Sequence, residues 1–264
     1  MSQNDVLLSV TPGGTAIITL NRPEKHNAFN ADVIATLSDM FETLRANTDE
    51  VRMVVLRGAG PSFSAGADLE WMKAAADWTH DDNEEDALGL ARMLRRLHDL
   101  PQLTVALVQG AAMGGGAGLV AACDVAIAVK DTKFRFSEVR LGLTPATISP
   151  FVVRAIGPRW AKALFATAEG FDGDFAHKIG LVQYVVDSAD DLDDTLEMVA
   201  KLVFAAAPGA VAAAKALVDE VTGQEIDDRL GKHTAKLIAD RRVSKEGREG
   251  LAAFLEKRKP VWVK

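Results

Sequence analysis

Two glycine-containing segments have the composition of a site that stabilises negative charge. They are Ser64-Ala65-Gly66-Ala67-Asp68 and 113–118 (MGGGAG), and each stands where a predicted strand has ended and a predicted helix begins. The first N–H groups of a helix lack an acceptor within the helix and carry the positive end of its dipole, and glycine allows close approach. Two such segments converging on one point would form an oxyanion hole for a thioester whose α-carbon becomes enolate-like. A second interpretation is that the glycines only form turns and allow tight packing.

Other glycine-dependent chemistries do not match these segments. A GxGxxG motif would need its last glycine where the chain has Leu119, and neither GxxxxGK[ST] nor GxSxG occurs. These absences argue against a dehydrogenase, a P-loop protein and a serine hydrolase. The five histidines are scattered and Cys123 is the single cysteine, which argues against a metal centre and excludes an intrachain disulfide.

Hydrophobic periodicity predicts the elements that position these segments. Val6–Val10 and Thr15–Leu20 read as the strands of a hairpin, and Asn30 is predicted to cap a helix. Apolar residues recur at helical spacing after that cap: Val33, Leu37, Met40, Phe41 and Leu44. Met53–Gly58 and 105–110 are similar buried strands 52 residues apart, a period compatible with turns of a ββα spiral.

The chain changes character near Leu192. Further strands are expected at 124–129 and 133–136, whereas helices are predicted at 192–206, 209–221, 226–239 and 245–257. The sequence therefore predicts an α/β core at 1–195 and a helical region at 196–264. The acidic run 81–86, between predicted helices at 69–78 and 87–100, is interpreted as a solvated loop.

Composition restricts the class of partner. A chain of 264 residues with 48% hydrophobic residues can bury a large core, and 30 basic against 37 acidic residues give a net charge of -7. That balance argues against nucleic-acid binding, because no excess of positive charge is available for a phosphate backbone. The first residues lack the pattern of a secretory signal, and the longest apolar stretch is interrupted by Asp124. We therefore expect a cytoplasmic protein with no membrane partner.

Five motifs in order resemble the crotonase (enoyl-CoA hydratase/isomerase) superfamily across essentially the whole chain. They are Asn21-Arg22-Pro23 with Asn27-Ala28, 63–69, 110–116 with Cys123-Asp124, 137–143, and 247–258. The resemblance implies an α/β fold, a spiral of ββα units with a C-terminal helical trimerisation region, assembled as a homotrimer or homohexamer. It also implies an acyl-CoA thioester substrate, so that coenzyme A is part of the substrate and no separate cofactor or metal is needed.

The resemblance assigns roles to particular residues. The N–H groups of Ala67 and Gly115 would form the oxyanion hole, and Glu138 would be the acid and base. The residues implied along coenzyme A are Lys25, Ala28, Ala65, Gly66, Asp68, Leu69 and Gly114, with Lys257 reaching a phosphate in a neighbouring subunit. Without the resemblance, Glu138 would be interpreted as a solvated carboxylate or one paired with Arg135 or Arg140.

The sequence departs from the two-carboxylate hydratases of this family at one position. Those enzymes carry a glutamate three residues after the middle glycine, where this chain has Gly118. Glu138 would then activate water and protonate the α-carbon in succession, alone or with Asp68, Glu70 or His98. A single glutamate also suits an isomerase, and a non-catalytic acyl-CoA binder is a third possibility.

The segment 137–157 resembles a bacterial subgroup of methylglutaconyl-CoA and isohexenylglutaconyl-CoA hydratases. Such a substrate carries a second carboxylate, with which Arg140 could pair. The resemblance thus implies hydration of a 3-methylglutaconyl-CoA-like thioester, in leucine degradation or fatty acid metabolism.

Overall fold

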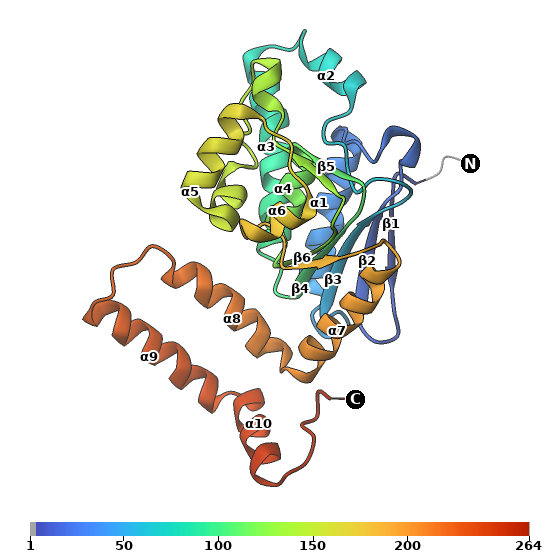
Figure 1. Ribbon diagram of the computed structural model, residues 1–264. Helices are drawn as coiled ribbons and strands as arrows, with labels where there is room; N and C mark the ends of the chain where they lie inside the picture. The colour runs from blue at the N-terminus through green and yellow to red at the C-terminus, as the bar shows by residue number, and fades with distance from the viewer. Residues whose placement is uncertain (1–3, 264) are drawn as a thin grey trace.

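The computed structural model describes residues 4–263, and a six-stranded sheet is its main layer (Figure 1). The strand order is β1-β2-β3-β4-β6-β8. The strands are β1 (Val6–Val10), β2 (Thr15–Leu20), β3 (Met53–Gly58), β4 (Leu103–Val108), β6 (Val125–Val129) and β8 (Tyr184–Val186). β1 and β2 pair antiparallel as a hairpin and the other neighbours pair parallel. The predicted hairpin and mixed sheet are confirmed.

A second, shorter layer of strand pairing positions the glycine segments. β5 (Ala111–Met113) pairs parallel with β7 (Lys133–Arg135), and single bridges join Phe29 to Ala67 and Ser64 to Ala112. Each turn of the chain therefore contributes a long strand to the main sheet, then a short strand to this layer, and then a helix. This repetition confirms the predicted α/β fold of ββα units.

Helices cover both faces of the main sheet (Figure 1). On one face lie α1 (Ala31–Ala46), α3 (His80–His98), α4 (Gly115–Ala122), α5 (Ser149–Thr167) and the short α6 (Gly173–Lys178). Asn30 caps α1 as predicted, accepting from the Val33 N–H over 2.9 Å, and Leu37 and Phe41 of this helix are fully buried. The other face packs against α7 (Asp191–Ala205) through Leu192, Val199 and Val203.

The acidic run was wrongly predicted to be a loop. α2 (Leu69–Ala75) is short, and the acidic residues belong to the first turns of α3. Thr79 caps α3 in a reciprocal capping box with Asp82, and acidic side chains near a helix N-terminus interact favourably with its dipole. The charge pattern that suggested a loop is therefore the pattern of a helix start.

The C-terminal helices form an arm that extends from the sheet (Figure 1). They are α8 (Pro208–Val221), α9 (Asp228–Val243) and α10 (Lys245–Leu255), close to the predicted ranges, and the boundary expected after residue 195 falls inside α7. Lys215 ties α8 to the core, donating to the carbonyls of Leu100 and Gln102 over 2.6 and 2.7 Å. Among residues 4–263 no single helix is long and apolar enough to cross a membrane. Helices α7 and α8, which are bent by 103° relative to each other, reach the necessary length and apolar composition only when they are taken together.

Candidate active site

The peptide that carries the Ala67 N–H is oriented by Phe29. The Phe29 N–H donates to the Gly66 carbonyl over 2.7 Å, and the Asp68 N–H donates to the Phe29 carbonyl over 2.7 Å. In a trans peptide the carbonyl and the following N–H point in opposite directions, so the Ala67 N–H points away from Phe29. This N–H has no acceptor within residues 4–263. Gly66 has a φ of +89°, which favours glycine at this position.

The Gly115 N–H is oriented by the helix that it begins. The Gly114 carbonyl accepts from the Gly118 N–H over 3.0 Å, so the Gly115 N–H points out of the N-terminus of α4. In the described part of the chain it too has no acceptor. The Gly114 N–H is itself held by the Arg135 carbonyl at 2.9 Å. The free donor therefore lies at the positive end of the helix dipole.

The two free donors lie on adjoining loops. The Met113 N–H donates to the Ser64 carbonyl over 3.0 Å. A Cβ atom on Gly66 would lie 2.8 Å from the Met113 carbonyl oxygen and 3.7 Å from the Gly115 nitrogen. A side chain at position 66 would thus enter the space between the loops. The loops that carry the Ala67 and Gly115 N–H groups therefore adjoin each other.

Glu138 places a half-buried carboxyl group beside the same loop. A Cβ atom on Gly114 would lie 3.2 Å from Glu138 Oε1, while Oε2 is buried and has no hydrogen-bond partner in the described chain. Burial raises the pKa of Glu138 above its ordinary value, which is suitable for a group that both takes and gives a proton. Within residues 4–263 no ion pair joins Glu138 to Arg135 or Arg140, and its Oε2 is shielded from solvent.

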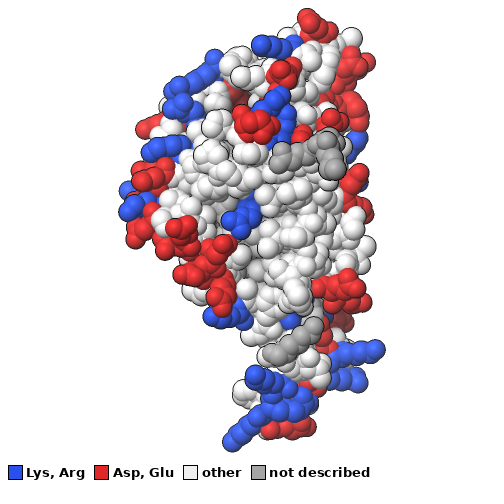
Figure 2. Space-filling model, turned by 90° about the vertical axis from the view of Figure 1, so that its right-hand side faces the viewer, with Lys and Arg blue, Asp and Glu red and all other residues white. Residues whose placement is uncertain are grey.

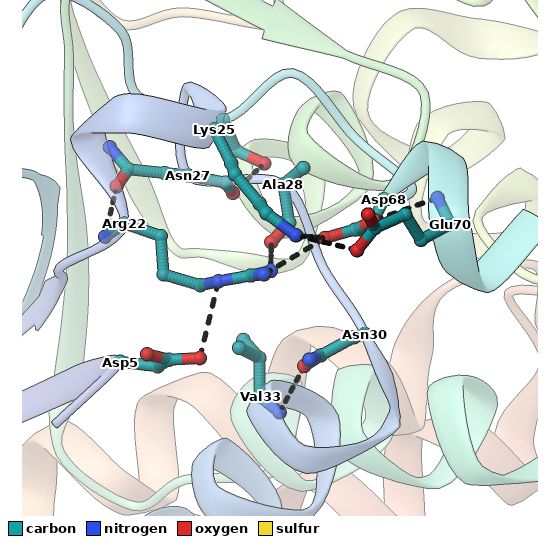
Figure 3. Close-up of polar contacts among 10 residues, drawn as sticks. Asp5, Arg22, Lys25, Asn27, Ala28, Asn30, Val33, Asp68 and Glu70 are labelled. Atoms are coloured by element: carbon teal, nitrogen blue, oxygen red, sulfur yellow. Dashed lines mark hydrogen bonds and ion pairs between the residues drawn. The ribbon is translucent and has the colours of Figure 1, made fainter. Parts of the chain in front are cut away.

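Buried contacts of Arg22 hold the loop that presents Ala67. Arg22 Nη1 donates to the Ala28 carbonyl over 2.7 Å, and Nη2 donates to Asp68 Oδ2 over 2.9 Å (Figure 3). Arg22 Nε lies 3.2 Å from Asp5 Oδ2. Arg22 is 7% exposed and Asp68 is 5% exposed, so this ion pair is shielded from solvent. The end of β2, the segment before α1 and the start of α2 are joined by one side chain.

Asp68 caps α2 and is also the centre of an ion network. It accepts from the Glu70 N–H over 2.9 Å at the start of α2. Burial alone would raise the pKa of Asp68, but hydrogen bonds from the Glu70 N–H, Arg22 and Lys25 outweigh burial and hold that pKa below its usual value. Lys25 Nζ lies 3.2 Å from Asp68 Oδ2 and 3.0 Å from Glu70 Oε2 (Figure 3).

The other predicted coenzyme A residues occupy different surroundings. Ala65 and Leu69 are exposed on the Ala67 side, Leu69 to 73%, whereas Ala28 is buried. Lys257 follows α10, which lies at the opposite end of the molecule from α2 (Figure 1). The single chain therefore does not bring Lys257 to its own Ala67.

The candidates for a second acid or base have other partners. Asp68 is occupied by Arg22 and Lys25, and the Glu70 side chain is 81% exposed. His98 lies on α3, with Nε2 3.2 Å from Asp219 Oδ2 on α8. None of the ion pairs or side-chain hydrogen bonds in residues 4–263 joins these groups to Glu138.

Sequence reasoning missed two residues that shape this site. Arg22 was recognised only as part of a motif, although a charged residue two positions after a buried strand was an available signal. Phe29 gave no signal, because apolar residues are abundant in the chain and its contacts depend on the tertiary structure.

Comparisons with known proteins show what the chain is similar to. The profile of the enoyl-CoA hydratase/isomerase family matches residues 11–264. The short-chain-enoyl-CoA hydratase of Clostridium acetobutylicum is 33% identical over 261 residues, covering 98% of this chain and 97% of that protein. An enoyl-CoA hydratase structure from Shewanella pealeana is 39% identical with a TM-score of 0.95, covering 99% of this chain and 97% of the other. The structure of Pseudomonas aeruginosa AtuE is also 39% identical, with a TM-score of 0.94 and coverage of 99% and 100%.

Proposed function

This chain belongs to the enoyl-CoA hydratase/isomerase family, and from that premise we propose that it adds water across the α,β double bond of an acyl-CoA thioester. One observation carries the proposal. The carboxyl of Glu138, whose Oε2 is buried without a hydrogen-bond partner, lies against the loop whose Gly115 N–H, together with the Ala67 N–H, has no acceptor in the described chain.

The proposed reaction uses one carboxyl group twice. The thioester oxygen accepts hydrogen bonds from the Ala67 and Gly115 N–H groups, which stabilise the charge of an enolate. The Glu138 carboxylate takes a proton from water as the oxygen forms a bond to the β-carbon. The protonated Glu138 then gives that proton to the α-carbon, so that one water is added and the carboxylate is regenerated.

The test is hydration of crotonyl-CoA, 3-methylcrotonyl-CoA and 3-methylglutaconyl-CoA, followed by loss of the absorbance of the conjugated thioester. Wild type should hydrate at least one of the three, and Glu138→Gln should lower the rate by about 10²- to 10⁴-fold while still binding coenzyme A esters. A wild type that binds these esters but hydrates none would exclude the hydratase proposal.

An isomerase is the second candidate, because position 118 supplies no second carboxylate. Glu138 would take a proton from the α-carbon of a β,γ-unsaturated thioester and return it to the γ-carbon through the same enolate. Conversion of 3-hexenoyl-CoA to the conjugated 2-enoyl isomer, without hydration, would favour this reaction.

We further propose a substrate with a second carboxylate, of the 3-methylglutaconyl-CoA kind. Arg140 lies two residues after Glu138 in the same short helical turn, is exposed, and has no ion pair among residues 4–263. Arg140→Met should raise the KM for 3-methylglutaconyl-CoA and leave that for 3-methylcrotonyl-CoA unchanged, because the two substrates differ by this carboxylate.

Self-association through surfaces with few charges is also proposed, as a homotrimer or homohexamer. Figure 2 shows a broad area of one face that carries few charged side chains and is interrupted near its centre by a basic side chain. Large apolar side chains are exposed on β1, α7 and the arm, among them Val10 (50%), Leu202 (66%) and Phe254 (79%). Exposed patches of this kind commonly mark protein interfaces. Light scattering should give three or six copies for wild type and a smaller particle for Phe254→Asp or Leu202→Asp.

A further inference from the structure

Ile148 fills the space beside Gly118. A Cβ atom on Gly118 would overlap Cγ2 of Ile148 and lie 2.9 Å from its Cβ atom. Ile148 is 1% exposed, and its carbonyl accepts from the N–H groups of Phe151 and Val152 at the start of α5. The beginning of α5 thus holds the isoleucine in place. Position 118 consequently has no room for a carboxylate, or for any side chain, unless Ile148 moves.

Ile148 and Glu138 lie against neighbouring positions of α4. Gly114 precedes the helix and Gly118 is four residues further on, about 6 Å along the axis. The Gly118 N–H donates to the Gly114 carbonyl over 3.0 Å, so the two positions follow one another on the same side of the helix. The Glu138 carboxyl lies against Gly114, and the Ile148 side chain lies against Gly118. One turn beyond the carboxyl, this side of α4 is therefore covered by an aliphatic side chain.

From these contacts we infer that Ile148 is a specificity-determining residue, against which hydrocarbon substituents on the β-carbon of the acyl chain pack. The inference rests on the proposed function, because it takes Glu138 and the two free N–H groups as the thioester site. With the thioester oxygen on the donors and the α-carbon at Glu138, the β-carbon is one bond further on. A methyl group there gains contact with Ile148, whereas a charged group would lose its hydration without gaining a partner.

The test measures exchange of α-hydrogens for deuterium in D₂O on two thioesters, one of which can contact Ile148 and one of which cannot. In this reaction Glu138 takes a proton from the α-carbon and returns a deuteron, without any addition of water. Acetyl-CoA has no β-carbon, and 3-methylbutanoyl-CoA has a branched one. Ile148→Ala should lower kcat/KM for exchange on 3-methylbutanoyl-CoA about tenfold and leave exchange on acetyl-CoA unchanged. Ile148→Val should give a smaller change in the same ratio.

An unchanged ratio of the two kcat/KM values in both variants would overturn the inference. This holds also where both values fall equally, because equal losses would show that Ile148 only supports the fold. If Ile148→Ala does not fold, the ratio of kcat/KM on 3-methylbutanoyl-CoA to kcat/KM on acetyl-CoA is measured in Ile148→Val and Ile148→Leu instead, and the same outcomes apply. A wild type that exchanges both thioesters but hydrates no enoyl-CoA would exclude the hydratase while leaving the ratio as the test of Ile148. A wild type that exchanges neither would exclude the thioester site and the inference together.

Discussion

The ring of Phe29 packs directly against Gly115. A Cβ atom on Gly115 would lie 3.1 Å from Phe29 Cε2 and 3.2 Å from Cδ2. The main chain of the same phenylalanine is hydrogen-bonded on both sides of Ala67. One buried residue, 1% exposed, therefore sets the separation of the two free N–H groups.

Gly115→Ala should consequently disturb the oxyanion geometry without removing a donor. The added methyl pushes on the Phe29 ring, and we expect kcat for α-hydrogen exchange on acetyl-CoA to fall about tenfold, less than the 10²- to 10³-fold loss for a missing donor. Gly89→Ala is the matched control, because nothing lies within 4 Å of a Cβ atom there. Equal kcat values for the two variants would contradict the role of Phe29.

The acid limb of the pH profile should report Glu138. Because burial raises the pKa of this carboxyl, its basic form is lost at a higher pH than for an ordinary glutamate. The kcat/KM for exchange on acetyl-CoA should therefore fall through a midpoint above 4.5 as the pH is lowered. A midpoint at or below that ordinary value would show that Glu138 is not the group that titrates.

Replacing Glu138 should stabilise the fold at neutral pH. A carboxyl whose pKa is raised by folding stabilises the native state below its unfolded pKa, and this contribution is lost as the pH rises through the folded pKa. Glu138→Gln should therefore melt about 2–4 °C above wild type at pH 8, with the difference shrinking towards pH 4. A lower melting temperature for the variant at pH 8 would contradict the burial of an unpaired charge.

Arg22→Met should cost both stability and turnover. The substitution leaves Asp68 buried with a single remaining cation, and removal of one partner from a buried pair costs about 3 kcal/mol in the free energy of unfolding. Because Asp68 adjoins Ala67, kcat for exchange should fall more than KM rises. Arg92→Met removes a cation that is 2.9 Å from Glu85 but solvent-exposed, and should cost below about 1 kcal/mol. Equal costs for the two substitutions would contradict the burial of the Arg22 pair.

Glu70→Gln should tighten the binding of coenzyme A esters if Lys25 contacts their phosphates. Lys25 is held by Glu70 and Asp68, which raise its pKa, so a phosphate must compete with Glu70 for the ammonium group. We expect KM to fall about two- to fivefold with kcat unchanged, and Lys25→Ala to raise KM. An unchanged KM in both variants would remove Lys25 from the binding site.

Local patterns predicted much of the fold. Val6–Val10 and Thr15–Leu20 form the expected hairpin, and Asn30 caps the expected helix, because each depends on neighbours in sequence. The acidic residues before Ala87 were misassigned because the capping box of Thr79 and Asp82 was not recognised. Charge density alone does not distinguish a loop from the first turns of a helix.

The site was less predictable than the fold. Motif order pointed to Ala67, Gly115 and Glu138, whose surroundings now support the proposed roles. The contact between Gly118 and Ile148 spans 30 positions and depends on how α5 packs on α4, so no local pattern encodes it. The sequence showed a missing carboxylate, and the structure shows that its space is filled.

The groups of the site come from consecutive turns of the spiral: Ala67 follows β3, Gly115 follows β5, and Glu138 follows β7. Early hydrophobic collapse of the N-terminal units can partly bury Trp71 and form helix without assembling both donors and the base. Recovery of activity during refolding should therefore lag behind recovery of fluorescence and circular dichroism, because non-local strand pairing is slow. Turnover thus reports that β7 has paired with β5 and brought Glu138 to Gly114, an event that a spectroscopic signal averaged over the chain does not distinguish.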